Sequence, residues 1–300
     1  MTSVDFGPHQ TRITRERLLD MITWRPRRMK LSLEWPDSLH KPKKSEDDWS
    51  VVLPFRETLG DAFEAMCDVP NIGMREGGGR CYTFLKDDSD DALVNTRRLL
   101  GLIGNYVAVR DCLALSFALD YDREEGNPDK PHTAIGALRG RAKPYDDIAT
   151  EDTRKAADDL ASKCLDFLKI MTCYCTATCV VGMPPSRPDK TFDLPSYIAQ
   201  KIAAMIGKPD LTRFVTTIKV RPQLKNESLD MKLASIEGTV SVEPLPFKDQ
   251  NVLLIDDLYQ SGISTNYVAM LMLEAGAKKV FGLACEKTCR NDDNMPRSSR

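Results

Sequence analysis

The chain has 300 residues, enough for one large or two ordinary domains with hydrophobic cores. Lys and Arg number 42 and Asp and Glu 44, so a formal net charge of −2 gives no argument for general binding to nucleic acids or membrane surfaces. No apolar run reaches the length of a membrane span, and residues 1–17 lack the apolar core of a signal peptide.

The first part of the chain, residues 1–50, is basic and rich in proline. Three tryptophans lie around its positive clusters at 25–30 and 41–44. Basic residues interleaved with tryptophans are typical of grooves for single-stranded nucleic acid. An arm whose tryptophans pack on its own domain or on a partner explains the pattern equally, because acidic residues follow at 46–48.

Apolar spacing predicts helices over residues 57–66 and 90–103. Residues 106–121 are apolar and fit either a helix or a strand. The polar stretch 122–130 is a natural boundary. We therefore expect a mainly helical N-terminal extension over residues 1–130, followed by a second domain over 131–290 and a polar tail over 291–300.

Four cysteines lie close together in the second domain, at Cys164, Cys173, Cys175 and Cys179. Zinc sites favour paired Cys-x-x-Cys knuckles, which this group lacks. Buried thiols and a metal site both remain open for them. The nine cysteines of the chain, without an export signal, favour reduced thiols in a cytoplasmic protein.

A strand, a turn and helices follow in the second domain. Residues 153–168 have helical spacing, and the short apolar run from Cys179 ends at a turn formed by Pro184, Pro185, Ser186 and Arg187. Residues 194–206 predict another helix, which Gly207 and Pro209 end. Residues 214–220 favour a strand, and a polar, lysine-rich segment comes next at 223–234.

The most informative stretch is residues 251–265. Four aliphatic residues, 252–255, indicate a strand buried on both faces, and two carboxylates, Asp256 and Asp257, follow them. A loop of small residues then opens a helix. Backbone N–H groups, hydroxyls and the positive end of a helix dipole form a phosphate cradle. Carboxylates repel phosphate but suit sugar hydroxyls or the waters of a magnesium ion, so the stretch predicts a site for a phosphorylated ribose.

This order of strand, acidic pair, hydroxyl and glycine loop, and helix resembles the phosphoribosyl-pyrophosphate signature of the type I phosphoribosyltransferases, in particular the ComF-like and amidophosphoribosyltransferase-like group. The resemblance covers residues 133–290, and Lys143 and Tyr145 match a basic and an aromatic residue that precede the core of that family. The sequence departs from the pattern at Gln260, where the family has Thr or Ser. The resemblance implies an α/β fold with a mostly parallel, Rossmann-like sheet flanked by helices.

The resemblance also implies a role for each matching residue. Asp256 and Asp257 are expected to hold the ribose hydroxyls and to orient Mg, which arrives with the substrate and its waters and has no direct protein ligand. The 5′-phosphate is expected at Gln260, Ser261, Gly262, Ile263 and Ser264. The pyrophosphate is expected at Pro185, Ser186 and Arg187. A mobile loop is expected to carry Lys219, Arg221, Lys225 and Lys232, although a solvated surface loop explains these lysines and the arginine equally.

The resemblance implies a protein that binds phosphoribosyl pyrophosphate, or a related ribose phosphate, and transfers or hydrolyses at ribose C1. No signature names the acceptor. Two alternatives stay open: a sensor that binds the ligand without turnover, and an effector whose residues 1–130 dock a protein or nucleic-acid partner, as in retron-type antiphage defence systems. The resemblance also leaves a homodimer open.

Overall fold

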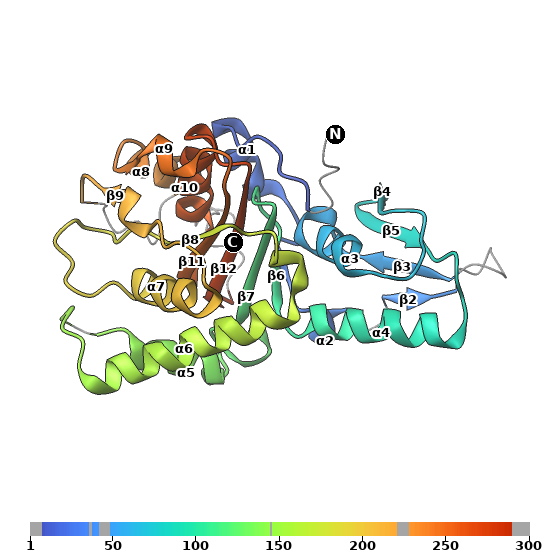
Figure 1. Cartoon of the computed structure of the whole chain (residues 1–300). Helices are drawn as coiled ribbons and strands as arrows, with labels where there is room; N and C mark the ends of the chain where they lie inside the picture. The colour runs from blue at the N-terminus through green and yellow to red at the C-terminus, as the bar shows by residue number, and fades with distance from the viewer. Residues whose placement is uncertain (1–7, 36–37, 42–48, 145, 221–227, 290–300) are drawn as a thin grey trace.

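The centre of the molecule is a six-stranded sheet (Figure 1). The computed structural model describes residues 8–35, 38–41, 49–144, 146–220 and 228–289. The strands of the sheet are β1 (Arg28–Met29), β6 (Val107–Val109), β7 (Leu115–Tyr121), β8 (Cys179–Gly182), β11 (Asn251–Tyr259) and β12 (Lys279–Lys287). Their order is β1-β6-β7-β12-β11-β8, parallel from β7 to β8 and antiparallel at the β1-β6-β7 edge. The expected α/β fold with a mostly parallel sheet is confirmed.

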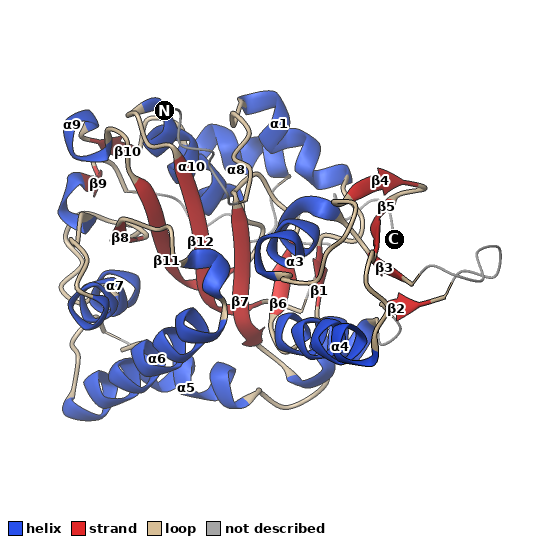
Figure 2. Cartoon of the chain, turned by 45° about the vertical axis from the view of Figure 1, so that its right-hand side comes forward, coloured by secondary structure: helices blue, strands red, loops and turns tan. Residues whose placement is uncertain are grey.

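Helices cover both faces of this sheet (Figures 1 and 2). One face is covered by α5 (Ala134–Ala142), α6 (Glu151–Ile170) and α7 (Leu194–Ile206). The other is covered by α10 (Ile263–Glu274), with α1 (Arg15–Asp20), α8 (Leu229–Ile236) and α9 (Pro244–Phe247) packed against α10. Beside this second layer, β9 (Val215–Thr217) and β10 (Val240–Val242) form an antiparallel ribbon.

Strand β11 is buried on both faces, as its aliphatic run predicts. Leu253 and Ile255 lie in the core shared with α6 and α7, whereas Val252 and Leu254 lie in the core shared with α10. Successive side chains of a strand alternate between faces, so four consecutive apolar residues supply both cores. Because this run is buried in both cores, the carboxylates that follow it, Asp256 and Asp257, lie at the carboxyl end of the strand, near the edge of the sheet.

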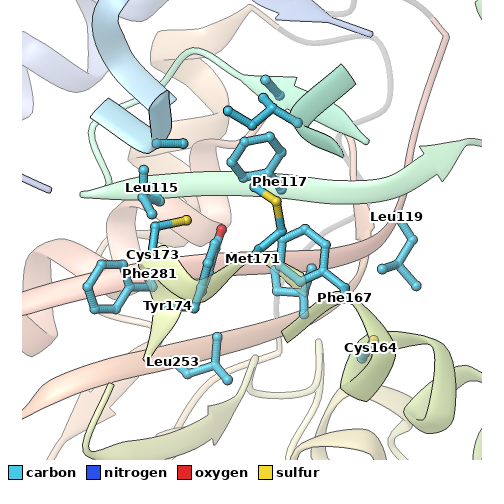
Figure 3. Packing of buried hydrophobic residues seen from close by; sticks show 14 of the residues in the cluster. Leu115, Phe117, Leu119, Cys164, Phe167, Met171, Cys173, Tyr174, Leu253 and Phe281 are labelled. Carbon is cyan, nitrogen blue, oxygen red and sulfur yellow. The ribbon is translucent and has the colours of Figure 1, made fainter. Parts of the chain in front are cut away.

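Aromatic side chains join α6 to the sheet (Figure 3). The rings of Phe167 and Tyr174 meet edge to face at 5.2 Å, and Tyr174 also lies 5.6 Å from Phe281 of β12. The buried hydroxyl of Tyr174 donates a hydrogen bond of 2.8 Å to the carbonyl of Gly282. Aromatic pairs of this kind stabilise a core by more than the burial of their apolar surface alone. These contacts therefore help to hold α6 against the sheet.

A second, four-stranded antiparallel sheet lies in the N-terminal part of the chain (Figure 2). In spatial order its strands are β2 (Leu39–His40), β3 (Ser50–Leu53), β5 (Arg80–Phe84) and β4 (Arg75–Gly77). The helices of this part are α2 (Leu31–Glu34), α3 (Asp61–Met66) and α4 (Asp90–Gly104).

The expected N-terminal extension contains strands as well as helices. Within the described residues, the segment before residue 131 holds the whole second sheet and also β1, β6 and β7 of the main sheet. The apolar run 106–121 forms β6 and β7. Both strands are buried on both faces, so their sequence is apolar throughout and its periodicity does not distinguish a strand from a buried helix. The main sheet thus contains strands from both sides of residue 131. The division into two domains at this residue stays a prediction. The predicted tail 291–300 lies outside the described residues.

The four clustered cysteines do not converge on one point. Cys164 and Cys173 are buried in the core beside α6, Cys179 is buried in the core beside α10, and Cys175 is exposed. Within the described ranges, no group of three or more His, Cys, Asp or Glu side chains is arranged to hold a metal ion. In the same ranges, no helix is both long and apolar enough to cross a membrane.

Candidate functional site

A cavity of about 310 Å³ opens at the carboxyl ends of β8 and β11. The turn after β8 contributes Pro185 and Ser186, and β11 contributes Asp256 and Asp257. These residues are about seventy positions apart in sequence and meet because the two strands are parallel neighbours. Ligands of open parallel sheets bind at this edge, so the predicted pyrophosphate turn and the predicted acidic pair lie in one candidate site.

The loop between β11 and α10 forms one wall of the cavity. Gln260, Ser261, Gly262 and Ser264 line it, whereas the side chain of Ile263 is buried and packs in the core beside α10. Helix α10 begins at Ile263, directly after this loop. The free N–H groups of a helix start attract anions, so the wall has the character of a phosphate cradle.

Gly262 is required by the geometry of this loop. Its φ of +80° is in the left-handed region, and a Cβ there would overlap the hydroxyl of Tyr259. That hydroxyl donates a hydrogen bond of 2.8 Å to the fully buried carboxylate of Asp111. The side-chain amide of Asn266 donates to the Tyr259 hydroxyl at 3.2 Å and to the Gly262 carbonyl at 2.9 Å. A buried polar network therefore supports the loop from below.

The two carboxylates of the acidic pair have different surroundings. The hydroxyl of Thr265 donates to Asp256 at 3.2 Å, and burial, followed by the charge of Asp257, raises the pKa of Asp256 to about 7. Burial also acts to raise the pKa of Asp257, but the charges of Arg139 and Lys143 outweigh it and hold that pKa below its usual value. The site thus contains one firmly ionised carboxylate and one that titrates near neutrality.

Arg139 of α5 links the acidic pair to a third carboxylate. Its Nε and Nη2 lie 3.0 and 2.8 Å from Oδ2 of Asp257, and its Nη1 lies 3.2 Å from Oε1 of Glu286. Burial raises the pKa of Glu286 to about 7 despite this arginine. Sequence reasoning missed both residues, although a glutamate within the apolar run of β12 was an available signal.

The positive side chains that line the cavity are lysines and not the predicted Arg187. Arg187 does not line the cavity: it pairs with Asp147 and, at 3.3 Å, with Asp189, so acidic neighbours hold its guanidinium on the outside. Lys143 and Lys190 line the cavity in its place. Tyr145, expected beside Lys143, lies outside the described residues.

The two described residues of the expected mobile loop, Lys219 and Lys232, do not line the cavity. Lys219 is exposed beyond β9, and Lys232 is buried within α8. Arg221 and Lys225 lie outside the described residues. The role of this segment stays a prediction.

The donor set of the cavity fits magnesium only in part. The carboxylates of Asp256 and Asp257 are oxygen ligands of the kind that Mg prefers, but the octahedral ion needs six and gives up its waters reluctantly. The sequence resemblance implies that water and a bound phosphate would supply the ligands, with the two carboxylates orienting those waters.

Comparison with known proteins finds similarity over a limited stretch of the chain. No family model matches the chain. It is 32% identical over 84 residues to amidophosphoribosyltransferase of Escherichia coli (strain K12) and 31% identical over 84 residues to that of Haemophilus influenzae. Each match covers 28% of this chain and 17% of the relative, so the chain spans about a sixth of the length of these relatives.

Among solved structures, the glutamine phosphoribosylpyrophosphate amidotransferase of B. subtilis, complexed with ADP and GMP, aligns with 79% of this chain and 46% of its own. The TM-score is 0.29 and the sequence identity 12%. The partial sequence matches, together with the α/β fold described above, support a phosphoribosyltransferase-like domain within the chain.

Proposed function

We propose that the chain binds phosphoribosyl pyrophosphate, or a related ribose phosphate, in the cavity at the end of β11. The observation that carries the proposal is the presence in one cavity of two carboxylates, Asp256 and Asp257, and a glycine-containing helix start at Gly262. The first suits sugar hydroxyls and the second suits a phosphate. A ligand with both groups a few ångströms apart matches the pair.

Each part of the site has a separate task in this proposal. The loop 260–264 binds the 5′-phosphate through N–H groups and hydroxyls, and Asp257, kept ionised by Arg139, accepts hydrogen bonds from the ribose hydroxyls. Lys143 and Lys190 face the pyrophosphate end. Asp256 and Asp257 would orient the waters of a magnesium ion that arrives with the substrate, and the ion would supply positive charge to the leaving group.

The chemistry proposed is substitution at ribose C1. The bond from C1 to the pyrophosphate oxygen breaks, pyrophosphate leaves with the electron pair, and a nitrogen nucleophile or water forms the new bond to C1. A carboxylate stabilises the positive charge that develops on the ring. Asp256, whose pKa lies near 7, is suited to accept the proton that the nucleophile loses.

Release of pyrophosphate tests the chemistry. The purified chain, with Mg and phosphoribosyl pyrophosphate, is expected to release pyrophosphate, slowly with water and faster with an amine acceptor. Asp257→Asn is expected to lower the rate at least ~100-fold, because it removes charge where the transition state is positive. The matched control is Asp249→Asn, an exposed aspartate ahead of β11 that pairs with Lys278 and is expected to leave the rate unchanged. Equal rates for both variants would contradict the chemistry.

A second candidate, docking of a nucleic-acid or protein partner by the N-terminal part, is favoured by one surface. Arg80, Tyr82 and Phe84 alternate along β5 and so share a face, and Arg75 of β4 stands directly opposite Tyr82. Both arginines are exposed and both aromatic rings are partly exposed. Basic and aromatic side chains together bind single strands. Binding of a fluorescent single-stranded oligonucleotide by the unaltered chain, and its loss in the double variant Tyr82→Ala and Arg80→Ala, would support this candidate. No binding by the unaltered chain would exclude it for that oligonucleotide.

A further inference from the structure

A buried arginine from the N-terminal segment lies beneath the loop of the candidate site. Arg27 precedes β1 directly and is only 6% exposed. Its Nη2 donates a hydrogen bond of 2.9 Å to the carbonyl of Ser261, 234 positions later in the chain. Its own carbonyl accepts from the N–H of Arg110 at 2.7 Å, which extends the pairing of β1 with β6. The pairing of β1 with β6 therefore places the guanidinium of Arg27 next to the backbone of the loop.

This hydrogen bond orients the peptide between Ser261 and Gly262. In a trans peptide the carbonyl and the following N–H point in opposite directions. Since the Ser261 carbonyl is held toward Arg27, which does not line the cavity, the Gly262 N–H is directed away from Arg27. The next carbonyl, that of Gly262, is likewise occupied from within the protein by Asn266. Both carbonyl oxygens, which repel an anion, are thus kept from the cavity.

Arg27 also places a full positive charge behind the loop. Charges act more strongly at a buried position than at the surface, because little water screens them. Helix starts attract phosphate through partial charges alone. A guanidinium one peptide unit behind the loop adds to that attraction without contacting the ligand.

We infer that Arg27 is a positioning residue of the phosphate site: it fixes the Ser261–Gly262 peptide with its N–H toward a phosphomonoester and supplies positive potential beneath it. The inference rests on the proposed function, because it takes the loop as the site of the 5′-phosphate. Its consequence is that the N-terminal segment completes the ligand site and is not only an appended docking module.

Calorimetric titration of the full chain with ribose 5-phosphate tests the inference. Arg27→Gln is expected to weaken binding roughly tenfold, the usual effect of losing a hydrogen bond from a charged group. Arg27→Lys, which keeps the charge but loses the planar fork, is expected to weaken it only about threefold. The matched control is Arg28→Gln. Arg28 is the next residue and is similarly buried, but its guanidinium donates to the Cys289 carbonyl and lies over the ring of Tyr121.

The control separates positioning from general stability. Both glutamine variants are expected to lower the melting temperature, whereas only the change at Arg27 is expected to lower affinity. Equal affinity losses at the two arginines, or wild-type affinity in Arg27→Gln, would overturn the inference. If Arg27→Gln does not fold, Arg27→Lys against Arg28→Lys decides by the same criterion. Absence of binding by the unaltered chain would instead overturn the proposed function, and the inference with it.

Discussion

The two ends of the candidate site are stabilised in different ways. At the acidic end, Arg139 pairs with the half-buried Asp257 and with the buried Glu286. At the loop end, a glycine turn and the neutral side chains of Tyr259 and Asn266 set the shape of the loop, and the buried charges of Arg27 and Asp111 lie behind it. The acidic end contains the carboxylates whose pKa values are raised toward neutrality and therefore responds to pH, whereas the loop end depends mainly on shape.

The first prediction breaks the charge balance and has the largest expected effect. Arg139→Met is expected to lower the free energy of unfolding by up to about 5 kcal/mol, because it leaves the buried Glu286 without its partner and Asp257 with only Lys143 at 3.8 Å. Urea denaturation measures the change. Arg187→Met, which removes a half-exposed arginine outside the cavity, is the control and is expected to cost less than about 1 kcal/mol. Similar losses for both variants would show that the acidic end is not a charge-balanced centre.

The second prediction breaks the shape of the loop. Gly262→Ala is expected to lower the free energy of unfolding by about 1–3 kcal/mol through its left-handed φ alone, with a further cost from overlap with Tyr259. Ribose 5-phosphate binding is expected to be lost at the same time. Thermal denaturation and calorimetry measure the two effects.

Gly101→Ala is the control for that substitution. Gly101 lies within α4, and a Cβ there meets no atom within 4 Å. The change is expected to raise the free energy of unfolding by about 0.5–1 kcal/mol, since alanine is the better helix former. Retention of ligand binding by Gly262→Ala would contradict the importance assigned to loop shape.

The third prediction tests the network below the loop. Tyr259→Phe removes the donor to the buried carboxylate of Asp111 and is expected to cost about 1–3 kcal/mol of stability. Tyr267→Phe is a suitable comparison, because its hydroxyl accepts a hydrogen bond from the N–H of Gly238 and lies outside this network. Ligand affinity should fall in Tyr259→Phe alone; an equal fall in both variants would argue against a special role for the network.

The fourth prediction concerns pH and has the smallest expected effect. The pKa of Asp256 is raised from 3.8 to about 7 in the folded chain, so the folded state binds more protons than the unfolded state between these values. The resulting stabilisation is present at pH 4 and is lost as the pH rises to about 7, at no more than about 1.4 kcal/mol per pH unit. Glu286 acts in the same direction, from 4.5 to about 7.

Asp256→Asn isolates this contribution. The variant is expected to show a shallower decline of stability between pH 4 and pH 7 than the unaltered chain, because the Asp256 part is removed while the parts due to Glu286 and Asp61 remain. Chemical denaturation at several pH values measures the slope. An identical slope in both proteins would mean that Asp256 is ionised throughout this range.

Local patterns in the sequence predicted the strand, the loop and the helix that meet at the cavity. The aliphatic run of β11, the acidic pair and the glycine loop are contiguous, and the structure brings them to the cavity with the turn at Pro185 and Ser186. The supports of this site were not predictable in the same way. Asp111 and Arg27 reach the loop only because β1 and β6 form an antiparallel edge on the main sheet.

The N-terminal strands escaped prediction for a related reason. β1 and β2 have two residues each and are defined by their partners rather than by a pattern of their own. The apolar run that forms β7 is buried on both faces, which removes the alternation that marks a strand. For Arg187 the sequence indicated the place in the chain but not the contact of the side chain. Arg187 follows β8 as expected, but its guanidinium pairs with Asp147 outside the cavity.

The most direct test of the central claim is calorimetry of the full chain with phosphoribosyl pyrophosphate and Mg. We expect one ligand to bind per chain and Gly262→Ala to abolish binding, with Gly101→Ala unchanged. No heat of binding at millimolar ligand, or equal binding by the two glycine variants, would contradict the assignment of this cavity as a ribose-phosphate site.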